Sequence, residues 1–447
     1  MKMIDMRRLS RQAVGACLAL LSHAALAAES AAPLSAPLPI YAGRPLDAFQ
    51  VTVADFEAQA RLQGESAVVP KPDKPKVAAS RVAVQVSGKD SASDALTLSW
   101  KDAWYSSLRF ESQGGQGVDL RPYMAQGVVA FDLNVLDLAK GGLSFKISCG
   151  KDCDRIVPFV LPGRALAGKG WQHLVLSLRC FARDGDDFSA ISQPFALEGG
   201  GAGSASIANI NFAASGTPNT ACPDYKTVSV TPDMLNESWS IDWWLPRHQD
   251  KLAEITRVKD SQIVFIGDSI TQGWEKEGAS LWQRHYKQYK AINLGYGGDR
   301  TENVLWRLQH GEVDGLKPKV AVLMVGTNNT GHRQEDPKTT AAGVKRILDE
   351  LRQRLPATKI LLLAIFPRDE FADGAARRIN DGVNALLPGF ADKRHIFFLN
   401  VNQAFLDKDG VLSREIMPDL LHPNEAGYAR WVAAMRPTLQ QLMRQSR

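Results

Sequence analysis

The stretch Ile263-Val-Phe-Ile-Gly-Asp-Ser-Ile-Thr-Gln-Gly-Trp274 decides the fold of the C-terminal half of this 447-residue chain. Its first four residues are apolar and three of them are β-branched, which is typical of a strand buried on both faces of a parallel sheet. Gly267 permits a sharp bend, so Ser269 should lie at the carboxyl edge of that sheet, where α/β proteins place ligands. Ser269 is therefore a candidate nucleophile, although Asp and Ser are also common in turns and helix caps.

Four more apolar segments follow this one and alternate with helix-like segments. The expected strands are residues 291–294, 320–325, 360–365 and 396–399, and two of the expected helices are residues 341–354 and 375–387. This alternation predicts a parallel sheet with right-handed crossovers and helices on both faces. The loops that follow the strands should therefore gather at one edge.

A histidine and a carboxylate that suit acyl transfer lie near the end of the chain. A serine hydroxyl is a poor nucleophile until a base takes its proton, and His422 follows Asp419 by three residues. Asp419 would orient the imidazole and stabilise the imidazolium that forms. The sequence therefore predicts Ser269, His422 and Asp419 as the catalytic residues.

The reaction also needs hydrogen-bond donors for the negative charge that develops on the carbonyl oxygen. The candidate donors of this oxyanion hole are the backbone N–H of Ser269, the backbone N–H of Gly298 and the side-chain amide of Asn328. Asp268 and Asp299 are expected to be architectural, holding turns through backbone N–H groups. His248 is expected to pack or to donate hydrogen bonds outside the site.

Four motifs carry a resemblance to a known family. Through Gly267-Asp-Ser-Ile-Thr-Gln-Gly-Trp274, Asn293-x-Gly-x-x-Gly-Asp299, Gly326-Thr-Asn-Asn329 and Asp419-x-x-His-Pro423, residues 240–447 resemble the SGNH (GDSL-type) hydrolases, in particular the α-subunits of the platelet-activating-factor acetylhydrolase type. The resemblance implies a flavodoxin-like three-layer fold, the triad Ser269, His422 and Asp419, and Gly298 and Asn328 in the oxyanion hole. Many members carry Asp at the position of Asn329, whereas the acetylhydrolase branch has Asn there, as this chain does. No metal ion or organic cofactor is expected.

The N-terminal half has the pattern of an all-β domain. Short alternating runs are separated by Gly, Pro and Asp clusters, which predicts an antiparallel jelly-roll sandwich. The expected strands are residues 82–86, 96–100, 128–133, 143–147, 174–178 and 207–212.

This half resembles the galactose-binding-like β-sandwich appended to some bacterial family 3 β-glucosidases. The likeness rests on Cys149-Gly-Lys-Asp-Cys153, Gly168-Lys-Gly-Trp171, Leu176–Phe181, Asp187-Phe188 and Pro194–Leu197. It implies an accessory module with a sugar as a candidate ligand. Trp100, Trp104 and Tyr105 are candidates for stacking on a sugar ring, and core or rim packing is the alternative.

The N-terminus predicts export. Basic residues precede an apolar stretch at 13–21 and small residues at 25–27, which is typical of a secretory signal peptide; acylation at Cys17 is an alternative. The predicted organisation is a signal peptide 1–27, a flexible leader 28–45, a β-sandwich 46–215, a linker 216–238 and a hydrolase domain 239–447. The expected location is secreted or periplasmic, without stable membrane insertion after cleavage, because no later apolar run is long enough to span a bilayer.

Four cysteines remain after the signal, which in an exported protein favours two disulfides. We expect Cys149 to pair with Cys153 and Cys180 with Cys222, although three connectivities exist. A zinc site is the alternative, but the spacing lacks a Cys-x-x-Cys knuckle.

Charge and composition reduce the number of function classes that the chain can belong to. The net charge is +5, of which the signal carries about +3, and no basic stripe with interleaved aromatics exists, so nucleic acid is not an expected partner. The sequence predicts an esterase for small acyl esters, above all acetyl, with an acetylated glycan as the expected substrate. A lipid or lysophospholipid esterase and a non-catalytic carbohydrate-binding protein are the alternatives.

Overall fold

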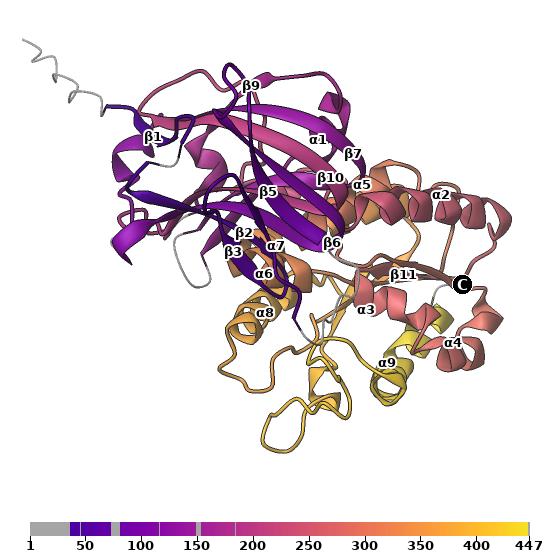
Figure 1. Cartoon of the computed structure of the whole chain (residues 1–447). Coiled ribbons are helices and arrows are strands. Elements are labelled where there is room, and N and C mark those ends of the chain that lie inside the picture. The colour runs from indigo at the N-terminus through magenta and orange to yellow at the C-terminus, as the bar shows by residue number, and fades with distance from the viewer. Residues whose placement is uncertain are drawn as a thin grey trace, which may run out of the picture. The chain divides into compact units, whose positions relative to one another are not determined.

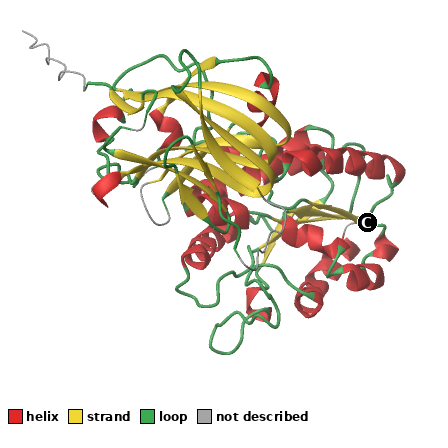
Figure 2. Ribbon diagram, viewed as in Figure 1, coloured by secondary structure: helices red, strands yellow, loops and turns green. Residues whose placement is uncertain are grey.

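The structure is a computed structural model, and it describes residues 36–44, 46–72, 81–115, 117–148, 153–183 and 185–445. The predicted signal peptide, Cys17 and half of the predicted leader lie outside these residues. Figure 1 labels the helices and strands, and Figure 2 distinguishes them by type. No helix in the described part is both long enough and apolar enough to cross a membrane.

The N-terminal half is an antiparallel β structure, as predicted. Its strands pair in the order β3-β2-β6-β10-β7-β8, while β1 adds to β10, β9 to β7, and β5 joins β4 to β6. The strands are β1 (Leu38–Tyr41), β2 (Phe49–Asp55), β3 (Gln59–Arg61), β4 (Ser66–Val68), β5 (Arg81–Ser87), β6 (Ala95–Ser112), β7 (Val128–Ser148), β8 (Asp154–Pro158), β9 (Gln172–Ser177) and β10 (Gln193–Ala213), and the α-helix α1 (Val160–Leu166) follows β8.

Three strands, β6, β7 and β10, are longer than the sequence indicated. Two expected strands, 128–133 and 143–147, are parts of the single strand β7. Gly141 pairs with Gly201 of β10 across the ladder, and both glycines have positive φ values, +71° and +78°. A register shift follows at Ala202, so the chain bends there without leaving the sheet.

The three aromatic residues proposed for sugar stacking have different environments. Trp100 is only 3% exposed and its Nε1 donates to the carbonyl of Gly200, so it belongs to the core. The hydroxyl of Tyr105 donates to Glu198. Trp104 is 66% exposed, which is more than either Trp100 or the half-buried Tyr105.

The C-terminal half contains a five-stranded parallel sheet, in agreement with the predicted fold. The strand order β12-β11-β13-β14-β15 places the first strand in sequence beside both the second and the third, which is the flavodoxin-like order. The strands are β11 (Ile263–Gly267), β12 (Ile292–Gly295), β13 (Val320–Met324), β14 (Lys359–Leu363) and β15 (Ile396–Leu399), and each expected strand coincides with one of them.

Helices cover both faces of this sheet. Alternate strand residues belong to two hydrophobic clusters, one shared with α2, α5, α7 and α8 and the other with α4 and α9. Such all-apolar strands are buried on both sides, as their fully buried side chains show. The helices are α2 (Ile241–Arg257), α3 (Ser269–Gln272), α4 (Ala279–His285), α5 (Thr301–Gln309), α6 (Thr327–Arg333), α7 (Pro337–Arg354), α8 (Ala375–Leu386) and α9 (Glu425–Gln445).

The predicted Cys180–Cys222 disulfide is present, with a Cα–Cα distance of 5.6 Å. Cys153 is also disulfide-bonded, and its predicted partner Cys149 lies outside the described residues.

Candidate active site

The turn after β11 places Ser269 at the carboxyl edge of the sheet. Gly267 ends the strand, and a Cβ at this position would collide with the carbonyl of Met324 and with Thr271, so the close approach requires glycine. Asp268 caps the short helix α3, because its carboxylate accepts a 3.0 Å hydrogen bond from the N–H of Ile270. Burial raises the pKa of Asp268 to about 7, and its role is architectural, as predicted.

Ser269, His422 and Asp419 form a continuous hydrogen-bonded chain. The distance between Ser269 Oγ and His422 Nε2 is 2.8 Å, and that between His422 Nδ1 and Asp419 Oδ2 is 2.6 Å. The other carboxylate oxygen of Asp419 accepts from the backbone N–H of His422 at 2.7 Å. A carboxylate that holds both the ring and the backbone of a histidine fixes the ring orientation.

The pKa of Asp419 is shifted in the direction that favours its ionised form. Partial burial works against ionisation, but the hydrogen bonds from the ring and backbone of His422 prevail and hold the pKa of Asp419 below its usual range. The side chains of His422 and Asp419 are 43% and 55% exposed, so the base is accessible from solvent.

The backbone around this pair is in a rarely populated conformation. Leu420 and Asp369 both have a φ of +60°, and the N–H of Asp369 donates to the carbonyl of Leu420 at 3.2 Å. The segment after β14 thus supports the loop that carries the base. Left-handed backbone at residues other than glycine gathers at functional sites, where neighbouring structure maintains it.

The predicted oxyanion donors lie at the ends of three adjacent strands. Gly298 follows β12 with a φ of +77°, and a side chain there would collide with the indole of Trp239. Asn328 follows β13, is 5% exposed, and donates one amide N–H to the carbonyl of Asp299 at 3.0 Å. This bond ties the first turn of α6 to the loop after β12, and the second N–H of the amide stays available as a donor.

Two residues outside the predicted site hold the loop after β12. Arg247 of α2 donates twice to the carbonyl of Gly295, at 3.0 and 2.8 Å, and Gln272 accepts from the N–H of Gly297 at 2.7 Å. Gln272 lies within the same motif as Ser269, so its position beside the nucleophile gave a signal. Arg247 lies 22 residues before Ser269 in an ordinary amphipathic helix, and no local pattern distinguishes it.

Asp299 has a structural role, as predicted, but its hydrogen-bond donors differ from those expected. Its carboxylate accepts from side chains, namely Trp244 Nε1 at 2.6 Å and Arg307 Nε at 2.8 Å, rather than from turn N–H groups. Arg307 also pairs with Glu312, and all three charged side chains are fully buried. His248 is buried, stacks on Trp244 and contacts the carbonyl of His310 at 3.2 Å, which agrees with a packing role.

The segment predicted as a linker is partly buried. Ser229 and Leu235 are 0% exposed. Ser229 Oγ donates to Glu335 at 2.6 Å and accepts from the amide of Asn329 at 3.1 Å. These contacts join the segment to α6 and to the residues that follow it. Across the described residues, no group of three or more His, Cys, Asp or Glu side chains is arranged to hold a metal ion.

Comparisons with known proteins agree with both halves of the fold. Residues 265–430 match the GDSL-like Lipase/Acylhydrolase family, and residues 58–212 match a Galactose-binding domain-like family. The subunit alpha1 of platelet-activating factor acetylhydrolase IB from Bos taurus is 34% identical over 205 residues, which cover 45% of this chain and 84% of that protein.

Two solved structures are similar to the separate halves. A GDSL-like lipase from Bacteroides thetaiotaomicron is 21% identical, with a TM-score of 0.38 and coverage of 43% of this chain and 97% of that one. The extra C-terminal domain of an exo-1,3/1,4-β-glucanase from a Pseudoalteromonas species is 14% identical, with a TM-score of 0.32 and coverage of 41% and 96%.

Proposed function

The chain belongs, through its C-terminal half, to the GDSL-like lipase/acylhydrolase family and is an ester hydrolase, and on that premise we propose that it is an exported serine esterase for small acyl esters, acetyl above all. The hydrogen-bonded chain from Ser269 through His422 to Asp419 carries the proposal. The acetyl preference is supported by the acetylhydrolase relatives.

The proposed reaction begins with proton transfer. Ser269 Oγ attacks the ester carbonyl carbon while His422 Nε2 takes the hydroxyl proton, and Asp419 stabilises the imidazolium. The N–H of Ser269, the N–H of Gly298 and the free amide N–H of Asn328 donate to the oxyanion. His422 then gives its proton to the leaving alcohol oxygen as the carbon–oxygen bond breaks.

Water completes the cycle. His422 removes a proton from a water molecule, the hydroxide adds to the acyl carbon, and collapse of the second tetrahedral intermediate returns the proton to Ser269 and releases the carboxylic acid.

We further propose that the ester decorates a carbohydrate. Support comes from the galactose-binding-like half, which shares the chain with the hydrolase.

The boundaries proposed for these parts remain 46–215 for the sandwich, 216–238 for the linker and 239–447 for the hydrolase, and the signal at 1–27 directs the protein to the periplasm or outside the cell.

Labelling with a fluorophosphonate probe tests the enzyme proposal. The full chain should be labelled, and the Ser269→Ala variant should not be. Absence of serine-dependent labelling in folded protein would refute a seryl-acyl mechanism. Acetate release from acetylated oligosaccharides, compared with release from p-nitrophenyl esters of increasing chain length, tests the substrate; a preference for long acyl chains would favour the lipid-esterase alternative.

A further inference from the structure

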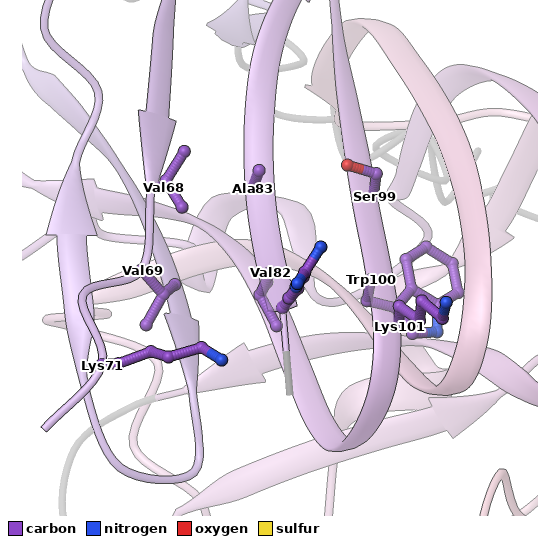
Figure 3. A pocket seen from close by; sticks show the side chains of 9 residues that line it. Val68, Val69, Lys71, Val82, Ala83, Ser99, Trp100 and Lys101 are labelled. Atoms are coloured by element: carbon purple, nitrogen blue, oxygen red, sulfur yellow. The ribbon is translucent and has the colours of Figure 1, made fainter. Parts of the chain in front are cut away.

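The β-sandwich carries a cavity of about 410 Å³, and its lining includes the buried residues Val69, Val82 and Trp100 as well as exposed ones (Figure 3). Its side chains come from β5, from β6 and from β4 with the residues that follow it. The residues that matter for its chemistry are Val68, Lys71, Arg81, Ala83, Ser99 and Lys101. None of them belongs to the proposed active site.

The strand register sorts these residues into two rows. Val68 pairs with Ala83, and Ala83 pairs with Ser99, so these three side chains form one row across the strands. Arg81 pairs directly with Lys101 in the next row on the same face, because residues two apart on a strand share a face. Figure 3 shows Lys71 reaching across from the chain after β4 toward Val82 of β5.

The second row places two positive charges, those of Arg81 and Lys101, directly opposite each other on neighbouring strands. Like charges directly opposite each other on neighbouring strands destabilise a sheet. Within the described ranges, no carboxylate lies within 4.0 Å of the charged nitrogens of Lys71, Arg81 or Lys101. An anion held between these cations would offset their repulsion and would be attracted by all three.

The neighbouring row is apolar and open. Val68 is 64% exposed, which is high for a valine that lines a cavity, and the smaller Ala83 lies beside it. Ser99 adds a hydroxyl that can donate or accept. A ligand that fits both rows has one apolar face, a hydroxyl group within reach of Ser99 and one acidic group.

We propose that this cavity, here called the basic cavity, binds a pyranose that carries an acidic group, either a carboxylate or a sulfate ester. The C–H face of the ring packs on Val68 and Ala83. The acidic group lies between Arg81 and Lys101, where each cation donates a charge-assisted hydrogen bond. The match of this half to a galactose-binding-like family is consistent with a sugar ring as the scaffold.

Calorimetric titration of the full-length protein tests the proposal. The ligands are a galacturonate tetramer, a sulfated galactose tetramer, the neutral galactose tetramer and sodium sulfate. At least one acidic oligosaccharide should bind about tenfold more tightly than the neutral one, and its affinity should fall as NaCl is raised. Comparison of the two acidic ligands identifies the acidic group.

Variants connect the binding to the cavity. The double variant Arg81→Ala/Lys101→Ala should weaken binding of the acidic oligosaccharide about tenfold, because two exposed charge pairs are lost. Lys169→Ala, which removes an exposed cation elsewhere on the sandwich, should leave the affinity within about twofold. Far-UV circular dichroism checks that each variant is folded.

Three results would overturn the proposal. These are equal affinity for neutral and acidic oligosaccharides, unchanged affinity in the folded double variant, and binding of inorganic sulfate as tight as that of the acidic oligosaccharides. None of the ligands contains a carboxylic ester, so the outcome is independent of Ser269 and of the proposed esterase function.

Discussion

Replacement of Asn328 by alanine should separate catalysis from stability. Loss of one oxyanion donor typically lowers kcat by about 10²- to 10³-fold, which corresponds to roughly 2.7–4 kcal/mol. The same change removes the 3.0 Å hydrogen bond to the carbonyl of Asp299. A buried carbonyl left without its donor costs about 1–3 kcal/mol of unfolding free energy.

Asn329→Ala is the matched control, because Asn329 is the same residue type and is fully buried one position later. Its amide donates to Ser229, Thr301 and Glu335, at distances of 2.8 to 3.1 Å. Its loss should lower stability at least as much as Asn328→Ala does. The folded Asn329 variant should nevertheless keep kcat within about tenfold of the parent, because none of its partners is a proposed catalytic group.

The assay is steady-state hydrolysis of p-nitrophenyl acetate, with urea unfolding of both variants in parallel. The expected pattern is a large kcat loss in Asn328→Ala and a large stability loss in Asn329→Ala. If folded Asn328→Ala retains kcat within about threefold of the parent, the proposed oxyanion role of this amide is wrong.

Three further outcomes are expected. Asp419→Asn should lower kcat by about 10⁴-fold. Because the pKa of Asp419 is depressed in the folded protein, the carboxylate contributes to stability above its unfolded pKa of about 3.9, and this contribution is lost as pH falls through the lower folded value. The Tm difference between the variant and the parent should therefore shrink in acid, and a pH-independent difference would contradict this. Trp239→Ala opens the space over Gly298 and should raise kcat/KM for butyrate relative to acetate esters by about tenfold, whereas an unchanged ratio would exclude Trp239 as a limit on acyl length. Cys180→Ala removes a cross-link between residues 42 apart and should lower the unfolding free energy by about 4 kcal/mol relative to the oxidised parent protein; the reduced parent is the control and should lose at least as much, and an unchanged unfolding free energy would contradict the prediction.

The sequence allowed the parallel sheet to be predicted strand by strand, because each strand is a short apolar run that ends in polar or glycine residues. The sandwich was harder to predict. Its strands β6, β7 and β10 run for 18 to 21 residues through glycines and charged residues that ordinarily end a strand. The expected strands 128–133 and 143–147 lie on either side of Gly141, which pairs with Gly201 across the sheet and so stays within β7.

In the candidate site too, some residues could be predicted from the sequence and others could not. Ser269, Asp419 and His422 could be proposed from the sequence because acyl transfer requires these residue types, although Asp419 and His422 lie in the loop between β15 and α9 rather than at the end of a strand. The supporting contacts of Arg247 and Trp239 could not, because they depend on tertiary packing between segments far apart in the sequence. For Trp100 the sequence left sugar stacking and core packing open, and its burial at 3% exposure favours core packing.

The partly buried segment 229–247, which precedes the parallel sheet, limits where the hydrolase half can be joined to another domain. The family match begins at residue 265, yet Ser229, Trp239 and Arg247 already contact residues of the hydrolase. An ancestral exchange that joined a new partner domain just before residue 265 would have removed the ring over Gly298 and the support for the loop after β12. Viable fusions should therefore have their crossover upstream of residue 228, and chimaeras made on either side of that position would differ in activity accordingly.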